Sequence, residues 1–242
     1  MKIYFAGAVP PYSQAVIKHG GQALLSFADP KSIIKFIEKH PNQKIFLDSG
    51  AFTAFTLGKK IDIQEYMQFI TDNKKNIETY ATLDVIGDWK ATKYNTELME
   101  SKGFKPLAVF HYQSPEAELK RLLGKYDYFA LGGLVPLASQ RKKLQEWLDY
   151  CFSIIQTNSK VHGLGMTGEW CLKRYPFYTV DSTSYLQSSR YGASHFIKDQ
   201  RLIRFNNKSK HYLSRTELEV VSTIGRQDNI TKLWESRGVK WD

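Results

Sequence analysis

The feature that most constrains this fold is an alternation of short apolar runs with longer amphipathic stretches. Seven runs rich in β-branched and aromatic residues predict buried strands, and an eighth strand is expected near 195–205. The seven runs are 2–8, 44–50, 79–86, 107–113, 128–134, 160–166 and 177–183. Strands separated by helices pair in parallel, so this pattern predicts a (β/α)₈ TIM-like barrel, with a doubly wound open sheet as the alternative.

Amphipathic stretches between these runs predict the helices of the barrel. They are 30–40, 62–73, 88–103, 114–125 and 138–156. Asp29 stands at an N-cap position, Gly103 stands at a C-cap position, and Cys151 falls on an apolar helix face that predicts a place in the core. The chain has no G-x-G-x-x-G after its first strand and no Walker A motif, which disfavours the nucleotide-binding forms of the open sheet. No cofactor is expected.

The charge balance favours a polyanionic partner. The 242 residues include 34 Lys and Arg against 24 Asp and Glu, a formal net charge of +10, which suits nucleic acid. No run approaches the roughly 18 apolar residues of a membrane span, so no membrane contact is expected. Two cysteines predict a reducing, cytoplasmic compartment and exclude a multi-cysteine zinc ribbon. We expect one domain over 1–242, with a basic C-terminal segment from about 190 to 242.

Polar residues stand where the predicted strands end, which is where parallel barrels carry their chemistry. Asp48, Asp84 and Asp181 each end a strand, and Gln113 ends another. Any one of these aspartates could merely cap a helix or a turn. Three carboxylates, an amide and two glycine-rich turns converging on one mouth indicate a site instead. The local spacing is not that of a metal-ligand motif, so no metal is predicted.

These motifs, in this order, resemble the tRNA-guanine transglycosylase superfamily. Members have a (β/α)₈ barrel and exchange guanine for a 7-deazaguanine base through a covalent glycosyl-enzyme intermediate. Five family motifs have counterparts here. D-S-G-G-F is similar to Asp48–Phe52, F-D-E-C to Asp84 in TLDV, and F-G-I-V-Q to Gln113 in VFHYQ. G-G-L is similar to Gly132–Leu134, and Y-L-M-G-V-G to His162–Gly165. The family's nucleophilic aspartate falls at Asp181, and the resemblance spans roughly 44–190.

The departures from that family point to one of its branches. The tRNA enzymes carry a C-terminal zinc site, whereas this chain has no cysteine after Cys171 and is shorter. A compact chain without a zinc subdomain resembles the phage-type DNA-guanine transglycosylases, the DpdA-like branch, as does the segment DSTSYLQSSRYG. The resemblance therefore implies DNA as the substrate, with tRNA as the alternative.

The resemblance also implies a role for each motif residue. Asp181 would attack C1′ of deoxyguanosine, and Asp48 would act as the general acid and base. Asp84 would accept bonds from N1–H and the 2-amino group of the base, while Gln113 and the Gly133 N–H would meet its carbonyl. Phe52 would stack on the purine, although a core aromatic is the alternative. The rest of the base pocket would be Ser49, Gly132, Leu134, His162, Gly163 and Leu164.

The partners follow from the same resemblance. DNA phosphates would meet the basic tail at Arg190, Lys198, Arg201, Arg204, Lys208 and Lys210. The stretch GGLVPLASQ has no acidic residue to meet an aminomethyl group, which favours 7-cyano-7-deazaguanine as the incoming base. The alternatives are a tRNA-guanine transglycosylase, a nucleic-acid N-glycosidase that uses water, and an inactive nucleic-acid-binding barrel.

Overall fold

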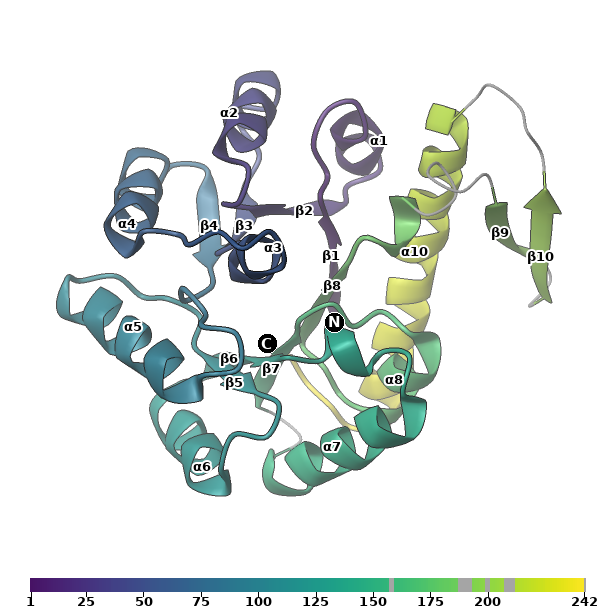
Figure 1. Cartoon of the computed structure of the whole chain (residues 1–242). Coiled ribbons are helices and arrows are strands. Elements are labelled where there is room, and N and C mark those ends of the chain that lie inside the picture. Colours follow the sequence, from purple (N-terminus) through teal and green to yellow (C-terminus); the bar gives the residue numbers. More distant parts are fainter. Residues whose placement is uncertain (157–158, 187–192, 199–200, 207–211, 242) are drawn as a thin grey trace.

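Eight parallel strands form one curled sheet that alternates with helices, which is a TIM-like α/β fold (Figure 1). The computed structural model describes residues 1–156, 159–186, 193–198, 201–206 and 212–241, with the backbone alone between 193 and 214. The strands are β1 (Lys2–Ala6), β2 (Gln22–Ser26), β3 (Ile45–Asp48), β4 (Ile77–Tyr80), β5 (Val109–His111), β6 (Tyr128–Gly132), β7 (Lys160–Gly163) and β8 (Thr179–Ser182).

The strand order is β4-β3-β2-β1-β8-β7-β6-β5. It follows the chain on both sides of β1 and places β1 beside β8, as in a TIM-like fold and unlike a doubly wound sheet. The outermost strands approach each other at one parallel bridge between Ala81 and Leu107. There the Leu107 N–H donates to the Tyr80 carbonyl at 2.8 Å, and the Thr82 N–H donates to the Leu107 carbonyl at 3.0 Å.

The prediction of the eighth strand was wrong. The missing strand is β2, whose sequence QALLS has no β-branched residue and so gives a weak strand signal. The region near 195–205 instead forms an antiparallel pair, β9 (Ala193–Lys198) and β10 (Arg201–Asn206), in a separate two-stranded sheet. In Figure 1 this hairpin lies outside the ring of helices, beyond the C-terminal helix.

The five predicted helices are confirmed with slightly narrower bounds. The helices are α1 (Ser13–Lys18), α2 (Pro30–Lys39), α3 (Ala51–Thr56), α4 (Ile63–Asp72), α5 (Trp89–Ser101), α6 (Glu116–Lys125), α7 (Arg141–Ile154), α8 (Glu169–Arg174) and α10 (Tyr212–Ser236), with 3₁₀ turns η1 (Val135–Leu137) and η2 (Ser184–Leu186). Asp29 caps α2 by accepting the Ser32 N–H at 3.2 Å. Among the described helices, none is both long and apolar enough to cross a membrane.

The core has an inner layer and an outer layer. Side chains alternate along each strand, and one set meets inside the curl of the sheet. This inner cluster is Tyr4, Ala6, Leu24, Phe46, Ala81, Leu107, Val109 and Ala130. The opposite faces of the strands pack against the helices in two larger clusters. Cys151 is fully buried in one of them, as predicted.

The C-terminal helix α10 covers the gap between α1 and α8 in the ring of helices (Figure 1). Side chains on α10 bind the first strand: the Ile3 N–H donates to Gln227 Oε1 at 2.8 Å, and the Met1 amino group donates to Thr231 Oγ1 at 3.1 Å. The Trp234 indole donates to the Leu172 carbonyl at 2.7 Å. These contacts join the two ends of the chain and complete the outer layer beside β8.

Candidate functional site

The strand alternation brings three polar side chains to one mouth of the sheet. Asp48 comes two residues after the inward-facing Phe46, and His111 comes two residues after the inward-facing Val109. Residues two apart share a face, so both side chains continue the inner layer toward the carboxyl ends of the strands. Asp181 is the next-to-last residue of β8 and lies at the same end of the sheet. That end is where parallel barrels hold their active sites.

Asp48 is held at this mouth by its neighbours on two strands. Its Oδ2 accepts the Gly50 N–H at 2.9 Å, and the Ser26 hydroxyl hydrogen-bonds to it from the paired position on β2. Burial is the main cause that raises the pKa of Asp48 to about 7, and the charges of Asp181 and Asp84 raise it further. A carboxyl group with a pKa near neutrality can both give and take a proton.

The turn after Asp48 requires glycine. Gly50 has φ of +78°, and a Cβ at this position would lie 2.4 Å from the Ala28 backbone nitrogen. The turn leads directly into α3, which carries Phe52. Phe52 is 44% exposed, so the core alternative for this residue is wrong, whereas Ser49 is buried at 1% exposure.

Asp181 is fixed by two donors to one of its oxygens. Its Oδ1 accepts the Gly165 N–H at 2.9 Å and lies 3.1 Å from His162 Nε2. Gly165 has φ of +71°, and a Cβ there would lie 2.5 Å from Val135 Cγ2. The positive φ therefore favours glycine in the turn that brings this N–H to the carboxylate.

A buried hydrogen-bond chain continues behind Asp181. His162 Nδ1 lies 2.7 Å from Thr179 Oγ1, which lies 2.6 Å from the Tyr128 hydroxyl. A carboxylate only accepts, so a neutral His162 must donate from Nε2 and accept at Nδ1. Thr179 then donates to His162 and accepts from Tyr128. The network thus assigns the tautomer of His162 and orients the Asp181 carboxylate.

Asp84 presents an oxygen with no hydrogen-bond partner. Its Oδ1 is buried, makes no hydrogen bond within the described residues, and lies 3.5 Å from His111 Nε2. Burial lowers the pKa of His111, but the charge and hydrogen-bonding capacity of Asp84 outweigh burial and raise it overall. Thr92 Oγ1 lies 3.4 Å from the same imidazole nitrogen. A buried acceptor whose nearest donor lies as far as 3.5 Å is poorly satisfied, which points to a ligand donor at this position.

The remaining predicted base-pocket residues lie at the ends of β6 and β7 or on the loops after β5, β6 and β7. Gln113 is exposed with φ of +65°, and among the described residues it is the one non-glycine with positive φ. Strain of this kind concentrates at functional sites. Gly132 ends β6, Gly133 follows it, and Leu134 is fully buried in the outer core. Gly163 ends β7, and Leu164 packs against the inner cluster.

The predicted DNA-binding tail falls in the least described part of the chain. Arg190, Lys208 and Lys210 lie outside the described residues. Lys198 lies on β9, and Arg201 and Arg204 lie on β10, where only the backbone is described. Their predicted role stays a prediction.

Sequence reasoning missed three residues that support the carboxylates. Ser26 ends the unrecognised strand β2, while Tyr128 and Thr179 lie on strands that were recognised. A signal did exist for Thr179, because it comes two residues before Asp181 and so shares its face of the strand. Tyr128 carried no such signal, since its link to Asp181 runs through side chains on three strands.

Neither a metal cluster in the described part of the chain nor a match to a known protein assists the interpretation of this site. Within the described residues, no group of three or more His, Cys, Asp or Glu side chains is placed to hold a metal ion. No protein-family model and no curated protein sequence matches the chain. Function must therefore be argued from the site itself.

Proposed function

We propose that this protein is a DNA-guanine transglycosylase that exchanges guanine in DNA for a 7-deazaguanine base. The proposal includes a closed (β/α)₈ barrel without a zinc subdomain, as in the compact phage-type enzymes. The observation that carries it is the unlike environment of two carboxylates in one mouth. Asp181 is held by two donors, whereas burial raises the pKa of Asp48 to about 7. Pairs of this kind divide into a nucleophile and an acid–base group.

The first half of the reaction releases guanine. An Asp181 oxygen attacks C1′ of deoxyguanosine, and the bond from C1′ to the base nitrogen breaks. The electron pair of that bond leaves with guanine, which takes a proton from the Asp48 carboxyl group. The product is a covalent aspartyl-deoxyribosyl ester. Carboxylates suit this step because the transition state resembles an oxocarbenium ion.

The second half installs the new base. Asp48, now ionised, removes a proton from the ring nitrogen of the incoming 7-deazaguanine. That nitrogen attacks C1′, and the ester bond to Asp181 breaks to restore the carboxylate. His162 takes no proton in this scheme, since it acts through Asp181 as a positioning residue rather than as a contact to the base.

Base recognition uses the unpaired acceptor at Asp84. Its buried Oδ1, whose nearest donor is His111 Nε2 at 3.5 Å, would accept N1–H or the 2-amino group of the base. Gln113 and the Gly133 N–H would meet the base carbonyl, and the exposed Phe52 would stack on the ring. The loop from Gly132 to Gln140 has no acidic residue, which favours the neutral 7-cyano-7-deazaguanine. The target nucleotide must leave the duplex or come from a single strand, because a stacked base cannot reach these groups.

The test is exchange of radiolabelled guanine into DNA and, in parallel, into tRNA. We expect label in DNA only, and a loss on the order of 10⁴-fold or more in Asp181→Asn. The matched control is Asp127→Asn, an exposed aspartate before β6 at the opposite end of the sheet, which should exchange normally. Wild-type protein should also form a covalent adduct with DNA on a denaturing gel.

Each of the other outcomes would indicate a different activity for this protein. Label entering tRNA would indicate a tRNA-guanine transglycosylase. Abasic sites without label would indicate an N-glycosidase that uses water. Exchange in neither nucleic acid, with binding retained, would indicate an inactive nucleic-acid-binding barrel.

A further inference from the structure

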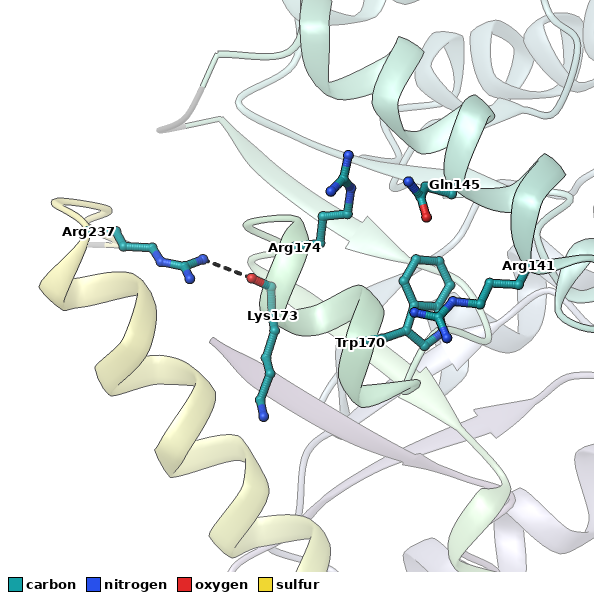
Figure 2. A pocket seen from close by; sticks show the side chains of 6 residues that line it. All are labelled: Arg141, Gln145, Trp170, Lys173, Arg174 and Arg237. Carbon is teal, nitrogen blue, oxygen red and sulfur yellow. Dashed lines mark hydrogen bonds between the residues drawn. The ribbon is translucent and has the colours of Figure 1, made fainter.

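A basic pocket lies on the outer flank of the fold, formed by helices rather than by strand ends. Its volume is about 440 Å³, and it is lined by side chains from α7, α8 and the residue after α10 (Figure 2). The lining residues are Arg141, Gln145, Trp170, Lys173, Arg174 and Arg237. Four of these six side chains are cationic and none is acidic. We call it the α7–α8 pocket.

Two of the four cations are already paired. Arg174 binds Asp149 at 2.9 Å, and Lys173 binds Glu169 at 2.6 Å. Arg141 and Arg237 differ, because no carboxylate among the described residues lies within ion-pair distance of either. Both residues are exposed. Their charges are therefore uncompensated and accessible to an anion.

Packing and one backbone contact hold these two arginines in place. Arg141 Cζ lies 4.7 Å from the centroid of the Trp170 ring, and the two side chains stack in Figure 2. Arg237 Cζ lies 4.8 Å from the Trp234 ring, and its Nη1 donates to the Lys173 carbonyl at 2.8 Å. A guanidinium that is already oriented loses less entropy when it binds an anion.

The topology connects this pocket with the carboxylate mouth. α7 follows β6 through the Gly132–Gly133 turn and η1, and α8 follows β7 through the turn that brings Gly165 to Asp181. The start of each helix therefore lies at the mouth end of the sheet. Arg141 and Trp170 stand at those helix starts, whereas Arg237 follows the end of α10. The pocket therefore lies on the flank of the fold, with one side formed by the mouth-end starts of α7 and α8.

We propose that the α7–α8 pocket binds phosphates of the nucleic acid outside the nucleotide that enters the mouth. The guanidinium fork matches phosphate geometry, and two fixed cations along one flank suit a phosphodiester chain. The substrate class rests on the proposed function, but phosphate binding by this pocket does not require base exchange. The pocket also uses none of the six basic residues predicted to bind DNA between 190 and 210, so it is a second contact surface.

The test measures binding of a fluorescein-labelled DNA duplex, by anisotropy, as a function of salt. The test variant is Arg141→Gln with Arg237→Gln. The matched control is Lys31→Gln with Lys35→Gln, which removes two exposed charges from α2. Each lost phosphate contact lowers the magnitude of the slope of log K against log salt by about 0.9. The slope of the test variant should therefore be smaller by about 1.8, and the variant should bind DNA roughly tenfold or more weakly at ~100 mM salt. The control should keep the wild-type slope.

A second variant separates charge from folding. Arg141→Lys with Arg237→Lys keeps both charges, so it should keep most of the slope, and thermal unfolding should show all variants folded. An unchanged slope in the glutamine variant overturns the proposal, as does wild-type protein that binds inorganic phosphate but no DNA. A reduced slope without detectable base exchange would support the pocket and count against the proposed enzyme. Base exchange with an unchanged salt slope in the glutamine variant would support the proposed enzyme and overturn the proposal for the pocket.

Discussion

Replacing Asp48 with asparagine tests whether this carboxyl group is buried among like charges. In the folded protein its pKa is raised from 3.8 to about 7, first by burial and then by Asp181 and Asp84. Folding therefore favours the protonated form. As pH rises from about 4 to about 7, wild-type protein loses stability through this group, and the loss is complete above about pH 7. Asparagine is neutral throughout, so the variant escapes this loss.

The size of the effect follows from the shift. A change of about three pH units corresponds to about 4 kcal/mol at 1.36 kcal/mol per unit. Part of this is shared with Asp181 and Asp84, and the new amide donor fits less well beside the Gly50 N–H. We therefore expect Asp48→Asn to be more stable than wild type by about 2 kcal/mol at pH 8, or roughly 4–8 °C in Tm. At pH 4 the two proteins should be nearly equal.

The assay is thermal unfolding of both proteins at half-unit steps from pH 4 to pH 8.5. Asp127→Asn removes an exposed charge and is the control, with a difference from wild type that stays small and flat. The reasoning is refuted if Asp48→Asn shows no growing advantage between pH 4 and pH 7, or if it is less stable than wild type at pH 8. Exchange activity should fall sharply in the same variant, because the acid–base group is gone.

Two further substitutions test the support of the site. Thr179→Val leaves His162 Nδ1 and the Tyr128 hydroxyl without a partner. Denaturant unfolding should therefore show a free energy of unfolding lower by about 1–3 kcal/mol. In the exchange assay, kcat should be roughly tenfold lower and KM unchanged. Thr179→Ser should restore both, and a normal kcat in Thr179→Val would contradict the positioning role. Gln113→Gly removes the left-handed backbone strain of Gln113, about 1–2 kcal/mol, but glycine loses more conformational entropy on folding. The free energy of unfolding should therefore stay the same or rise by up to ~1 kcal/mol. Base exchange should fall about tenfold in Gln113→Gly. Gln113→Asn should keep more activity, because asparagine tolerates this backbone conformation and retains an amide. Equal activity in wild type and both variants would show that the Gln113 amide does not contribute to the site.

The local sequence determined most of the strands and helices. Short continuous apolar runs and amphipathic stretches with caps such as Asp29 are set by residues close together in the chain. The sequence also predicted Asp48 and Asp181 at the carboxyl ends of their strands, because parallel strands end at one edge. The strand predicted over 79–86 was placed too late: β4 ends at Tyr80, so Asp84 lies on the loop that follows it. The strand β2 was not readable, since its short sequence has no β-branched residue and is stabilised by pairing with β1 and β3.

Only the tertiary structure decided the electrostatics of the site. The raised pKa of Asp48 depends on burial and on charges far away in sequence, and the tautomer of His162 depends on Tyr128 and Thr179 from neighbouring strands. The α7–α8 pocket likewise joins Arg141 to Arg237 across nearly a hundred residues of chain. Patterns along a chain encode which face a side chain takes, whereas the distance between two charges is fixed only when the strands and helices pack.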